Sequence, residues 1–419
     1  MGVQFNQAQL KAIYASDPNI VVVAPPGSGK TAVLCGALKE YLYLHPSYSL
    51  VAITFTRKAA QELASKISDN RVQTSTIHSW CLKQLEKFGA KYNFRVDIME
   101  EEEMRRIMQK IAYSKNMKFI NIYQLYNYIV GNVKTLDLDE IIAKKYEKLK
   151  ALYIKYKADF GLYDFTDLPQ YLLNVLKEYD EEIYNIDGLF VDEFQDIDEI
   201  QFQIFEKVQA RKKFYIGDFR QSIYGFNGAL DNIFSLLTKA NFVTYNLNTN
   251  YRSQQSIMDI ADSFRDSYEN KIDSIMDFGV VYPSDTICAR GKGGKIYLID
   301  KDGNCTTEGE AIETNPYLVI QHLLDIPDTM ILCRTNRQVR KIQTLGLNNC
   351  STVHQAKGLE YTNVILIDMP IDNTEELNIA YVGMTRAKNE LCIINYEYFV
   401  YLISKFHFTQ CEQIDDALF

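Results

Sequence analysis

Short apolar or β-branched runs recur along the chain, and each is followed by turn residues and then by a helical pattern. This alternation is typical of parallel β-sheets covered by helices, because each parallel connection needs a crossover segment. We expect two such sheets. The runs that predict strands are residues 20–23, 50–53, 189–191, 214–216, 242–245, 330–332, 364–367 and 391–394.

Two segments interrupt the alternation. From about residue 88 to residue 160 no strand pattern appears, and apolar side chains follow the spacing of a helix face, so we predict a helical insertion. The segment 277–315 is rich in Gly, Asp and Lys, which predicts an irregular connection. The positions with helical spacing are Ile142, Tyr146, Leu149, Tyr153 and Tyr156.

Composition limits the classes of protein. With 419 residues the chain is long enough for about two to four domains, and 47% apolar and 12% aromatic residues exclude a mainly disordered state. The chain has 45 Lys plus Arg against 54 Asp plus Glu, a net charge of −9. That balance excludes a surface that is basic throughout, but it is compatible with a local basic groove.

The sequence also bears on location. No run of 18 apolar residues occurs, and residues 1–9 lack the basic and apolar regions of a secretory signal. The 8 cysteines form no C-x-x-C pair, so neither a zinc ribbon nor a disulfide scaffold is indicated. We therefore expect a soluble cytoplasmic protein with reduced thiols and no membrane partner.

A phosphate-binding loop is predicted directly after the first strand. Residues 24–31 have the sequence APPGSGKT and precede a segment that can open a helix. Small residues let backbone N–H groups face phosphate oxygens at the helix N-terminus, where Lys30 reaches the β and γ phosphates. Thr31 supplies a hydroxyl for Mg²⁺. Only Ala24, in place of Gly, departs from the usual pattern.

A pair of carboxylates follows the strand at 189–191. Asp192 can hold the metal ion, and Glu193 can orient or deprotonate water. Hydrolysis of a γ phosphate also needs positive charge at the transition state. Arg252 and Arg386 are the candidates for it, although spacing alone does not distinguish them from surface arginines.

The order of the motifs resembles that of superfamily 1 DNA helicases of the UvrD/Rep/PcrA group, over most of the chain outside the insertion. The resemblance implies two RecA-like parallel-sheet P-loop NTPase domains with a helical 1B insertion in the first. The segments that carry it are 5–9, 24–31, 54–60, 74–79, 163–168, 191–196, 217–229, 250–253, 331–336, 353–360 and 380–388.

This resemblance implies a role for each matching residue. ATP and Mg²⁺ are the implied cofactors, with Thr31 and Asp192 at the metal and Glu193 as base. The implied catalytic residues are Lys30, Glu193, Gln221, Arg252 and Arg386. The implied nucleotide contacts are Gln9, Ala24, Pro25, Gly27, Ser28, Gly29, Lys30, Thr31, Tyr251, Arg252, Glu360 and Arg386.

A second group of residues is expected to contact single-stranded DNA. Aromatic rings stacked on bases, together with cations along the backbone, bind a single strand without reading its sequence. Trp80, the only tryptophan, is expected in the core instead. The implied DNA contacts are Phe55, Arg57, His78, Phe226 and His354.

The chain departs from the pattern of the group in three places. Phe226 and Asn227 stand where Trp and Arg are usual, which keeps a stacking face and removes one cation. Ala32 replaces an Arg that follows the phosphate loop. Phe219 and Arg220 replace a typical acidic pair, with an effect that sequence does not predict.

The largest departure concerns domains. In larger members a long helical 2B insertion separates the segments that correspond to 331–336 and 353–360, whereas here only residues 338–352 lie between them, too few for a domain. The predicted division has four segments: domain 1A, first part, 1–87; insertion 1B, 88–160; domain 1A, second part, 161–247; and domain 2A, without 2B, 248–419.

These features together predict an ATP-dependent 3′–5′ DNA helicase and single-stranded DNA translocase. Closure and reopening of two domains around ATP would move it along DNA, and its substrates would be single strands and junctions. We expect a monomer with a replication or repair partner. Three alternatives are a translocase that needs a partner to unwind, an ATP-dependent DNA-binding switch, and an RNA helicase of the same superfamily.

Overall fold

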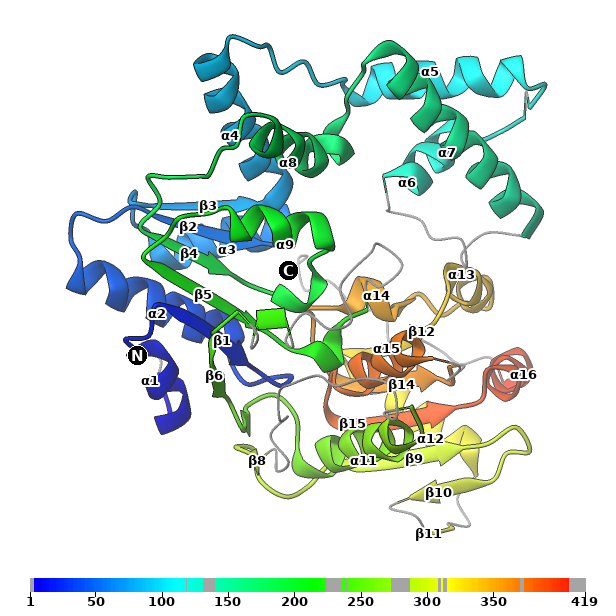
Figure 1. Ribbon diagram of the computed structural model, residues 1–419. Helices are drawn as coiled ribbons and strands as arrows, with labels where there is room; N and C mark the ends of the chain where they lie inside the picture. The colour runs from blue at the N-terminus through cyan, green and yellow to red at the C-terminus, as the bar shows by residue number, and fades with distance from the viewer. Residues whose placement is uncertain are drawn as a thin grey trace, which may run out of the picture.

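The structure is a computed structural model, and it describes residues 4–117, 119–130, 140–223, 236–237, 240–272, 287–307, 310–311, 315–369 and 373–406. Two β-sheets, each covered by helices, and a third group made of helices alone form this part of the chain (Figure 1). The helical group projects from the first sheet unit, above the second one in the view of Figure 1.

The first sheet has the strand order β3-β2-β4-β5-β1-β6, and all its neighbouring strands are parallel. Alternate residues of β1 enter different cores: Val21 and Val23 pack on one face, Ile20 and Val22 on the other. The strands are β1 (Asn19–Val23), β2 (Leu50–Thr54), β3 (Val72–Thr76), β4 (Gly188–Val191), β5 (Lys212–Gly217) and β6 (Val243–Asn246).

Helices cover both faces of this sheet. One core contains side chains of the three N-terminal helices, and the other contains side chains of three later helices. The first group is α1 (Gln7–Ile13), α2 (Lys30–Leu44) and α3 (Arg57–Ile67), and the second is α4 (Ile77–Tyr92), α8 (Leu168–Glu178) and α9 (Glu199–Glu206). Trp80 on α4 is fully buried, which confirms its place in the core.

The second sheet has the order β11-β10-β9-β15-β14-β12-β13. Its central strands are parallel, but β10 runs antiparallel to both β9 and β11, so the prediction of a purely parallel sheet is wrong at this edge. The strands are β9 (Lys295–Ile299), β10 (Cys305–Thr307), β11 (Glu310–Ala311), β12 (Thr329–Cys333), β13 (Cys350–Thr352), β14 (Tyr361–Ile367) and β15 (Ala387–Ile394).

Six helices accompany this second sheet within the described ranges. Side chains of α12, α13 and α16 pack in one core, and those of α11, α14 and α15 in the other. Their bounds are α11 (Gln255–Ile272), α12 (Pro316–Leu324), α13 (Asn336–Thr344), α14 (Val353–Ala356), α15 (Thr374–Met384) and α16 (Tyr396–Phe406). A short pair, β7 (Thr249–Asn250) and β8 (Ile287–Cys288), lies between the sheets in sequence.

The α/β class with two RecA-like sheets is thus confirmed, while the segment 277–315 needs correction. Its described residues hold β8, β9, β10 and β11, where an irregular connection was expected. β8, β10 and β11 have only two or three residues each, and positive-φ glycines such as Gly291 and Gly303 lie between the strands, so turn residues dominate the pattern there. β9, with the apolar sequence KIYLI, is a strand that the prediction missed.

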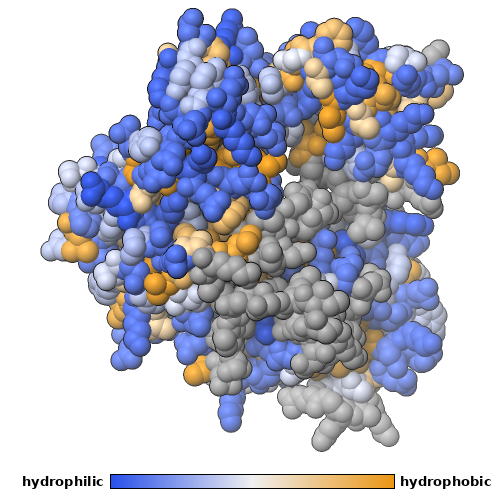
Figure 2. Space-filling model, in the orientation of Figure 1, coloured by the Kyte–Doolittle hydropathy of each residue, from blue (hydrophilic) through white to orange (hydrophobic). Residues whose placement is uncertain are grey.

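The helical insertion has its own core. It consists of α5 (Glu101–Ser114), α6 (Ile122–Ile129) and α7 (Glu140–Phe160). Tyr146, Leu149 and Tyr153 of α7 are buried in that core, as their spacing predicts, and Tyr156 packs against it. Ile142 is the exception, since it is exposed. On the coloured part of the face shown in Figure 2, apolar side chains lie among hydrophilic ones, including on this insertion.

Two absences hold for the residues with described placement. None of their helices has the length and apolar character that would let it cross a membrane. Seven cysteines fall in this part, and all are buried free thiols.

Candidate functional site

The loop that follows β1 is shaped for a phosphate. Gly27 and Gly29 have φ angles of 68° and 82°, a left-handed conformation that favours glycine, and Gly29 caps the N-terminus of α2. A Cβ on Gly27 would lie 2.7 Å from the Cβ of Arg252, so only glycine lets the second sheet unit approach this loop. The backbone thus leaves a cradle at the positive end of a helix.

Lys30 and Thr31, the first two residues of α2, face the carboxylates of Asp192 and Glu193, which directly follow β4. Lys30 Nζ donates to Glu193 Oε2 at 2.8 Å, and Thr31 Oγ1 donates to Asp192 Oδ2 at 3.4 Å. The first sheet pairs β4 with β5 and β5 with β1, which brings these distant segments to one edge. The structure therefore assembles the predicted phosphate and metal residues.

The two adjacent carboxylates have opposite pKa shifts. Burial and the charge of Glu193 raise the pKa of Asp192 to about 7. Burial would also raise the pKa of Glu193, but the ammonium groups of Lys30 and Lys357 outweigh it and lower this pKa to about 2. Burial alone would lower the pKa of Lys30, yet the surrounding carboxylates raise it. Glu193 is therefore ionised, so both of its carboxylate oxygens can accept hydrogen bonds.

These residues fit a Mg²⁺-nucleotide. Ser28 Oγ is buried and has no hydrogen-bond partner among the described residues, so a phosphate oxygen would satisfy it. The hydroxyl of Thr31 and the carboxylate of Asp192 are the hard oxygen ligands that Mg²⁺ prefers. The cradle at Gly27 and Gly29 leaves room for the phosphates.

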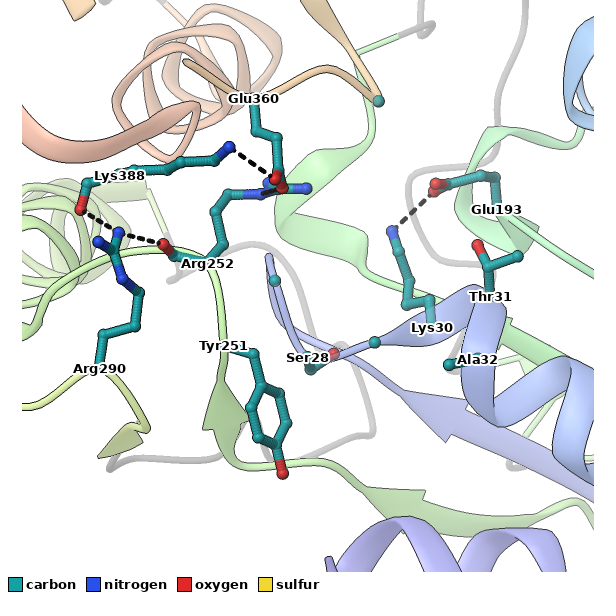
Figure 3. Close-up of a pocket in the computed structure, with 13 residues that line it drawn as sticks. Ser28, Lys30, Thr31, Ala32, Glu193, Tyr251, Arg252, Arg290, Glu360 and Lys388 are labelled. Carbon is teal, nitrogen blue, oxygen red and sulfur yellow. Dashed lines mark hydrogen bonds and ion pairs between the residues drawn. The ribbon is translucent and has the colours of Figure 1, made fainter. Parts of the chain in front are cut away.

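A cavity of about 430 Å³ opens between the loop and the second sheet unit. Figure 3 shows Lys30, Thr31 and Glu193 on one side of it, and Arg252, Glu360 and Lys388 on the other. Its lining residues are Gly27, Ser28, Gly29, Lys30, Thr31, Ala32, Glu193, Tyr251, Arg252, Arg290, Gly358, Glu360 and Lys388.

Ion pairs order the far wall of this cavity. Glu360 accepts from Arg252 Nε at 2.8 Å and pairs with Lys388 Nζ at 2.9 Å. Arg290 Nη1 donates to the backbone carbonyls of Arg252 and Lys388, at 2.9 and 3.0 Å. Burial would raise the pKa of Glu360, but Lys388 and Arg252 lower it, so its carboxylate is ionised.

Gln221 joins the two halves behind the cavity. Its Nε2 donates to Asp218 Oδ2 at 2.6 Å, and its Oε1 accepts from Arg386 Nη2 at 3.0 Å. Arg386 is buried, and desolvation together with the charge of Arg252 lowers its pKa to about 9. Lys357 adds a second link, since its Nζ donates to Asp196 Oδ2 at 2.5 Å. Gln221 and Arg386 are thus in direct contact, although neither lines the cavity.

Gln9 and Tyr251, two of the expected nucleotide contacts, lie at the other end of the loop. Gln9 Nε2 donates to Ser28 O at 2.9 Å, and Gln9 forms a capping box with Asn6 at the start of α1. Asn6 Nδ2 donates to Tyr251 Oη at 2.9 Å, which orients the half-exposed ring of Tyr251. Ala24 and Pro25 are buried within the loop.

The expected DNA contacts are placed on both sheet units. Arg57 lies over the ring of Phe165 at 5.6 Å, and His78 stacks on the same ring at 5.0 Å. Phe55 follows β2 and is exposed. His354, on α14, lies 3.2 Å from the carbonyl oxygen of Ile223. The remaining prediction, Phe226, lies outside the described residues.

Sequence did not assign several residues that build the site. Lys357 and Lys388 stand inside the recognised motifs but received no role. Arg290 lies in the segment expected to be irregular, so no pattern pointed to it. Asn250 begins the matching segment 250–253, and its Nδ2 donates to Pro26 O at 2.8 Å, which ties the second half to the phosphate loop.

Comparison with known proteins agrees with this geometry. The family model for the UvrD/REP helicase N-terminal domain matches residues 5–241, and the model for the UvrD-like helicase C-terminal domain matches residues 348–398. The chain spans about half the length of the curated relatives it matches.

Three of these relatives are named helicases. A probable DNA helicase II homolog of Mycoplasma capricolum is 27% identical over 79% of this chain and 49% of that protein. The ATP-dependent DNA helicase Rep of Buchnera aphidicola is 30% identical over 66% and 46%. The ATP-dependent DNA helicase PcrA of Leuconostoc citreum is 28% identical over 81% and 48%. The family model alone covers more than half of the sequence, and the chain belongs to the UvrD/REP helicase family.

Proposed function

We propose that this protein is an ATP-dependent 3′–5′ DNA helicase that translocates along single-stranded DNA. The observation that carries the proposal is the two-sided site, in which Lys30 and Glu193 of the first sheet unit face Arg252 and Glu360 of the second. A site that is complete only when both halves contribute converts the binding and loss of a γ phosphate into relative movement.

The residues divide the work of hydrolysis. Bound Mg²⁺ supplies charge neutralisation at the phosphates, with Thr31 and Asp192 as its ligands. Glu193, whose pKa is lowered to about 2, accepts a hydrogen bond from the attacking water and orients it. Arg252 and Arg386 stabilise the charge that develops on the γ phosphate. Gln221 responds to whether the γ phosphate is bound.

DNA would lie across both units. Arg57, His78 and Phe55 belong to the first unit and His354 to the second, so closure of the site changes the separation of two gripping surfaces. Phe226 is proposed as a further stacking ring. Stacking of this ring on a base and cationic contacts with the DNA backbone do not depend on the DNA sequence. Such contacts suit a motor that moves along single-stranded DNA and opens junctions.

The domain division remains part of the proposal. We assign residues 1–87 and 161–247 to domain 1A, 88–160 to insertion 1B, and 248–419 to domain 2A. The helix α13 is followed by β13 after residues 345–349, and this short connection supports a motor without a 2B insertion. A monomer is the proposed working form.

Strand displacement tests the function directly. We expect unwinding of forked and 3′-tailed duplexes, no unwinding of 5′-tailed ones, and ATP hydrolysis stimulated by DNA oligomers more than by RNA. Unwinding of 5′-tailed duplexes alone would show that the protein moves in the 5′–3′ direction, opposite to the one proposed. ATPase activity without displacement at any protein concentration would favour a translocase that needs a partner, and stimulation by RNA alone would make it an RNA helicase.

Glu193→Gln tests the catalytic assignment. Its amide keeps the shape of the side chain but cannot accept a proton, so turnover should fall by about 10²- to 10⁴-fold while ATP binding persists. Equilibrium binding of a fluorescent ATP analogue and DNA-stimulated phosphate release measure the two effects. Glu182→Gln, on a loop where this side chain is half-buried, is the matched control and should keep full turnover. Normal hydrolysis by Glu193→Gln would falsify the base assignment.

A further inference from the structure

Arg220 occupies a position that sequence left unexplained. It lies in the short helix η4 (Phe219–Gln221), directly before Gln221, where related motifs carry an acidic residue. Asp218 caps this turn, since its Oδ1 accepts from the backbone N–H of Arg220 at 3.0 Å. The side chain of Arg220 is only 9% exposed, so its charge needs a partner in the protein.

The partners of Arg220 belong to the second sheet unit. Its Nη1 lies 3.3 Å from Asp262 Oδ1, and its Nη2 lies 3.0 Å from Asp266 Oδ1. Asp262 and Asp266 are one turn apart on α11, so both carboxylates face the same cation. Tyr381 of α15 donates to Asp262 Oδ1 at 3.1 Å. An acidic residue at position 220 would meet two like charges here.

A second set of contacts holds the same turn. Asn378 of α15 donates from Nδ2 to Ser222 O at 2.7 Å and to Phe219 O at 3.4 Å. Asn378 is itself hydrogen-bonded by the buried Arg265 of α11. The turn that carries Gln221 is therefore fixed to α11 and α15, which belong to the opposite half of the molecule.

We propose that Arg220 is a positioning residue that couples the nucleotide site to movement of the second sheet unit. Gln221 contacts Arg386 at one end of the turn, and Arg220 pairs with α11 beside it. A displacement of Gln221 that accompanies loss of the γ phosphate is passed to α11 through the two ion pairs. This inference rests on the proposed function, because it names the residues through which ATP hydrolysis would be coupled to movement of the second sheet unit.

Arg220→Met tests this role, because methionine fills a similar volume without charge. We expect ATP affinity to be retained, while the number of ATP molecules hydrolysed per nucleotide of translocation rises about fivefold or more. Arg211→Met, which removes an exposed arginine paired with Asp187 at 3.6 Å on the first sheet unit, is the matched control and should leave the ratio unchanged. An unchanged ratio in Arg220→Met overturns the proposal.

A charge swap separates coupling from a merely structural effect. Asp266 is 59% exposed, so this end of the pair tolerates substitution. Arg220→Asp should raise the number of ATP molecules hydrolysed per nucleotide of translocation further than Arg220→Met does. Adding Asp266→Arg should bring this number back toward that of the wild type. Failure of the double variant to improve on Arg220→Asp contradicts the proposal. If Arg220→Met does not fold, Asp266→Asn serves in its place, with a smaller expected rise.

A distance measurement keeps the two proposals distinguishable. Fluorescent labels on the two sheet units should report a nucleotide-dependent change in the wild type, and this change should be lost in Arg220→Met at saturating ATP analogue. A wild type that closes on nucleotide but unwinds nothing refutes the proposed function and leaves the coupling role standing. Equal closure in both proteins refutes the coupling role.

Discussion

Gly27 shows at the scale of one residue why the phosphate loop and the second sheet unit meet. Its φ is 68°, and an added Cβ would lie 2.7 Å from both Arg252 Cβ and Asn250 Oδ1. Gly27→Ala should therefore displace both partners and weaken ATP binding about tenfold or more, which corresponds to about 1.4 kcal/mol. Isothermal titration with a non-hydrolysable ATP analogue measures the change.

The control for Gly27→Ala must separate backbone strain at a positive φ from the steric clash of the added Cβ. Gly346 has a φ of 95°, and an added Cβ would meet nothing within 4 Å. Gly346→Ala should lower the free energy of unfolding by about 1–2 kcal/mol through backbone strain, with ATP affinity unchanged. Equal losses of ATP affinity in the two variants would show that the contact at Gly27 is not what matters.

The sequence predicted the role of a residue where a local motif determines its chemistry. It did not predict the role of a residue whose contact partner lies far away in the sequence. Lys30, Thr31, Asp192 and Glu193 were assigned from local patterns, and the structure brings them together. Arg220 could not be interpreted because Asp262 and Asp266 lie on a different sheet unit, and nothing near Arg220 in sequence indicates them.

Among the elements, α7 is attached to the first sheet unit by a buried charge cluster. Lys157 Nζ donates to Asp164 Oδ2 at 2.8 Å and to Asp167 Oδ1 at 2.7 Å, and Tyr153 Oη donates to Asp164 Oδ2 at 2.8 Å. Lys157→Met leaves Asp164 buried without its cation, which should cost about 3–5 kcal/mol of the free energy of unfolding. Urea denaturation followed by circular dichroism measures the loss.

The same helix provides the comparison. Lys155 pairs with Asp159 at 3.0 Å, but both side chains are more than half exposed. Lys155→Met should therefore cost less than about 1 kcal/mol. If the two lysine variants lose the same stability, the buried cluster does not anchor the insertion.

The pH dependence of this cluster follows from Asp164. Burial would raise the pKa of Asp164, but Lys157 and its other hydrogen bonds lower it. A lowered pKa gives stability that is present above the unfolded pKa of about 3.9 and is lost as the pH falls through the folded value. In Lys157→Met the ammonium group that lowers the pKa of Asp164 is gone, so burial raises this pKa. The difference in the free energy of unfolding between the wild type and Lys157→Met should therefore be largest at neutral pH and should become smaller in acid.

Elements were predicted well where burial on both faces makes a strand apolar throughout. Such runs gave β1, β2, β4 and β14, whose residues are nearly all buried. The missed strand β3 has the sequence VQTST at an edge of the first sheet, where only one side has a neighbouring strand. A polar edge strand is held by backbone pairing, which an apolar pattern does not reveal.

On the scale of the whole molecule, each sheet unit is packed around cores of its own. Each sheet has cores on both of its faces, and the insertion has another. The nucleotide cavity lies where the two sheet units meet, lined by residues from both. Motif order predicted some of the residues that line this cavity, such as Lys30, Arg252 and Glu360. The contacts between units, such as Lys357 with Asp196, depend on three-dimensional packing and had no signature in the sequence.

This arrangement predicts how nucleotide changes unfolding. A ligand that binds only the folded state at a concentration of 100 times its Kd stabilises it by about 2.7 kcal/mol. Because ATP would contact both sheet units, a saturating ATP analogue with Mg²⁺ should raise the calorimetric transitions of both. In Arg252→Ala, where the second unit would lose its proposed phosphate contact, the analogue should shift mainly the transition of the first unit. A shift confined to one unit in the wild type would mean that the nucleotide does not bridge them.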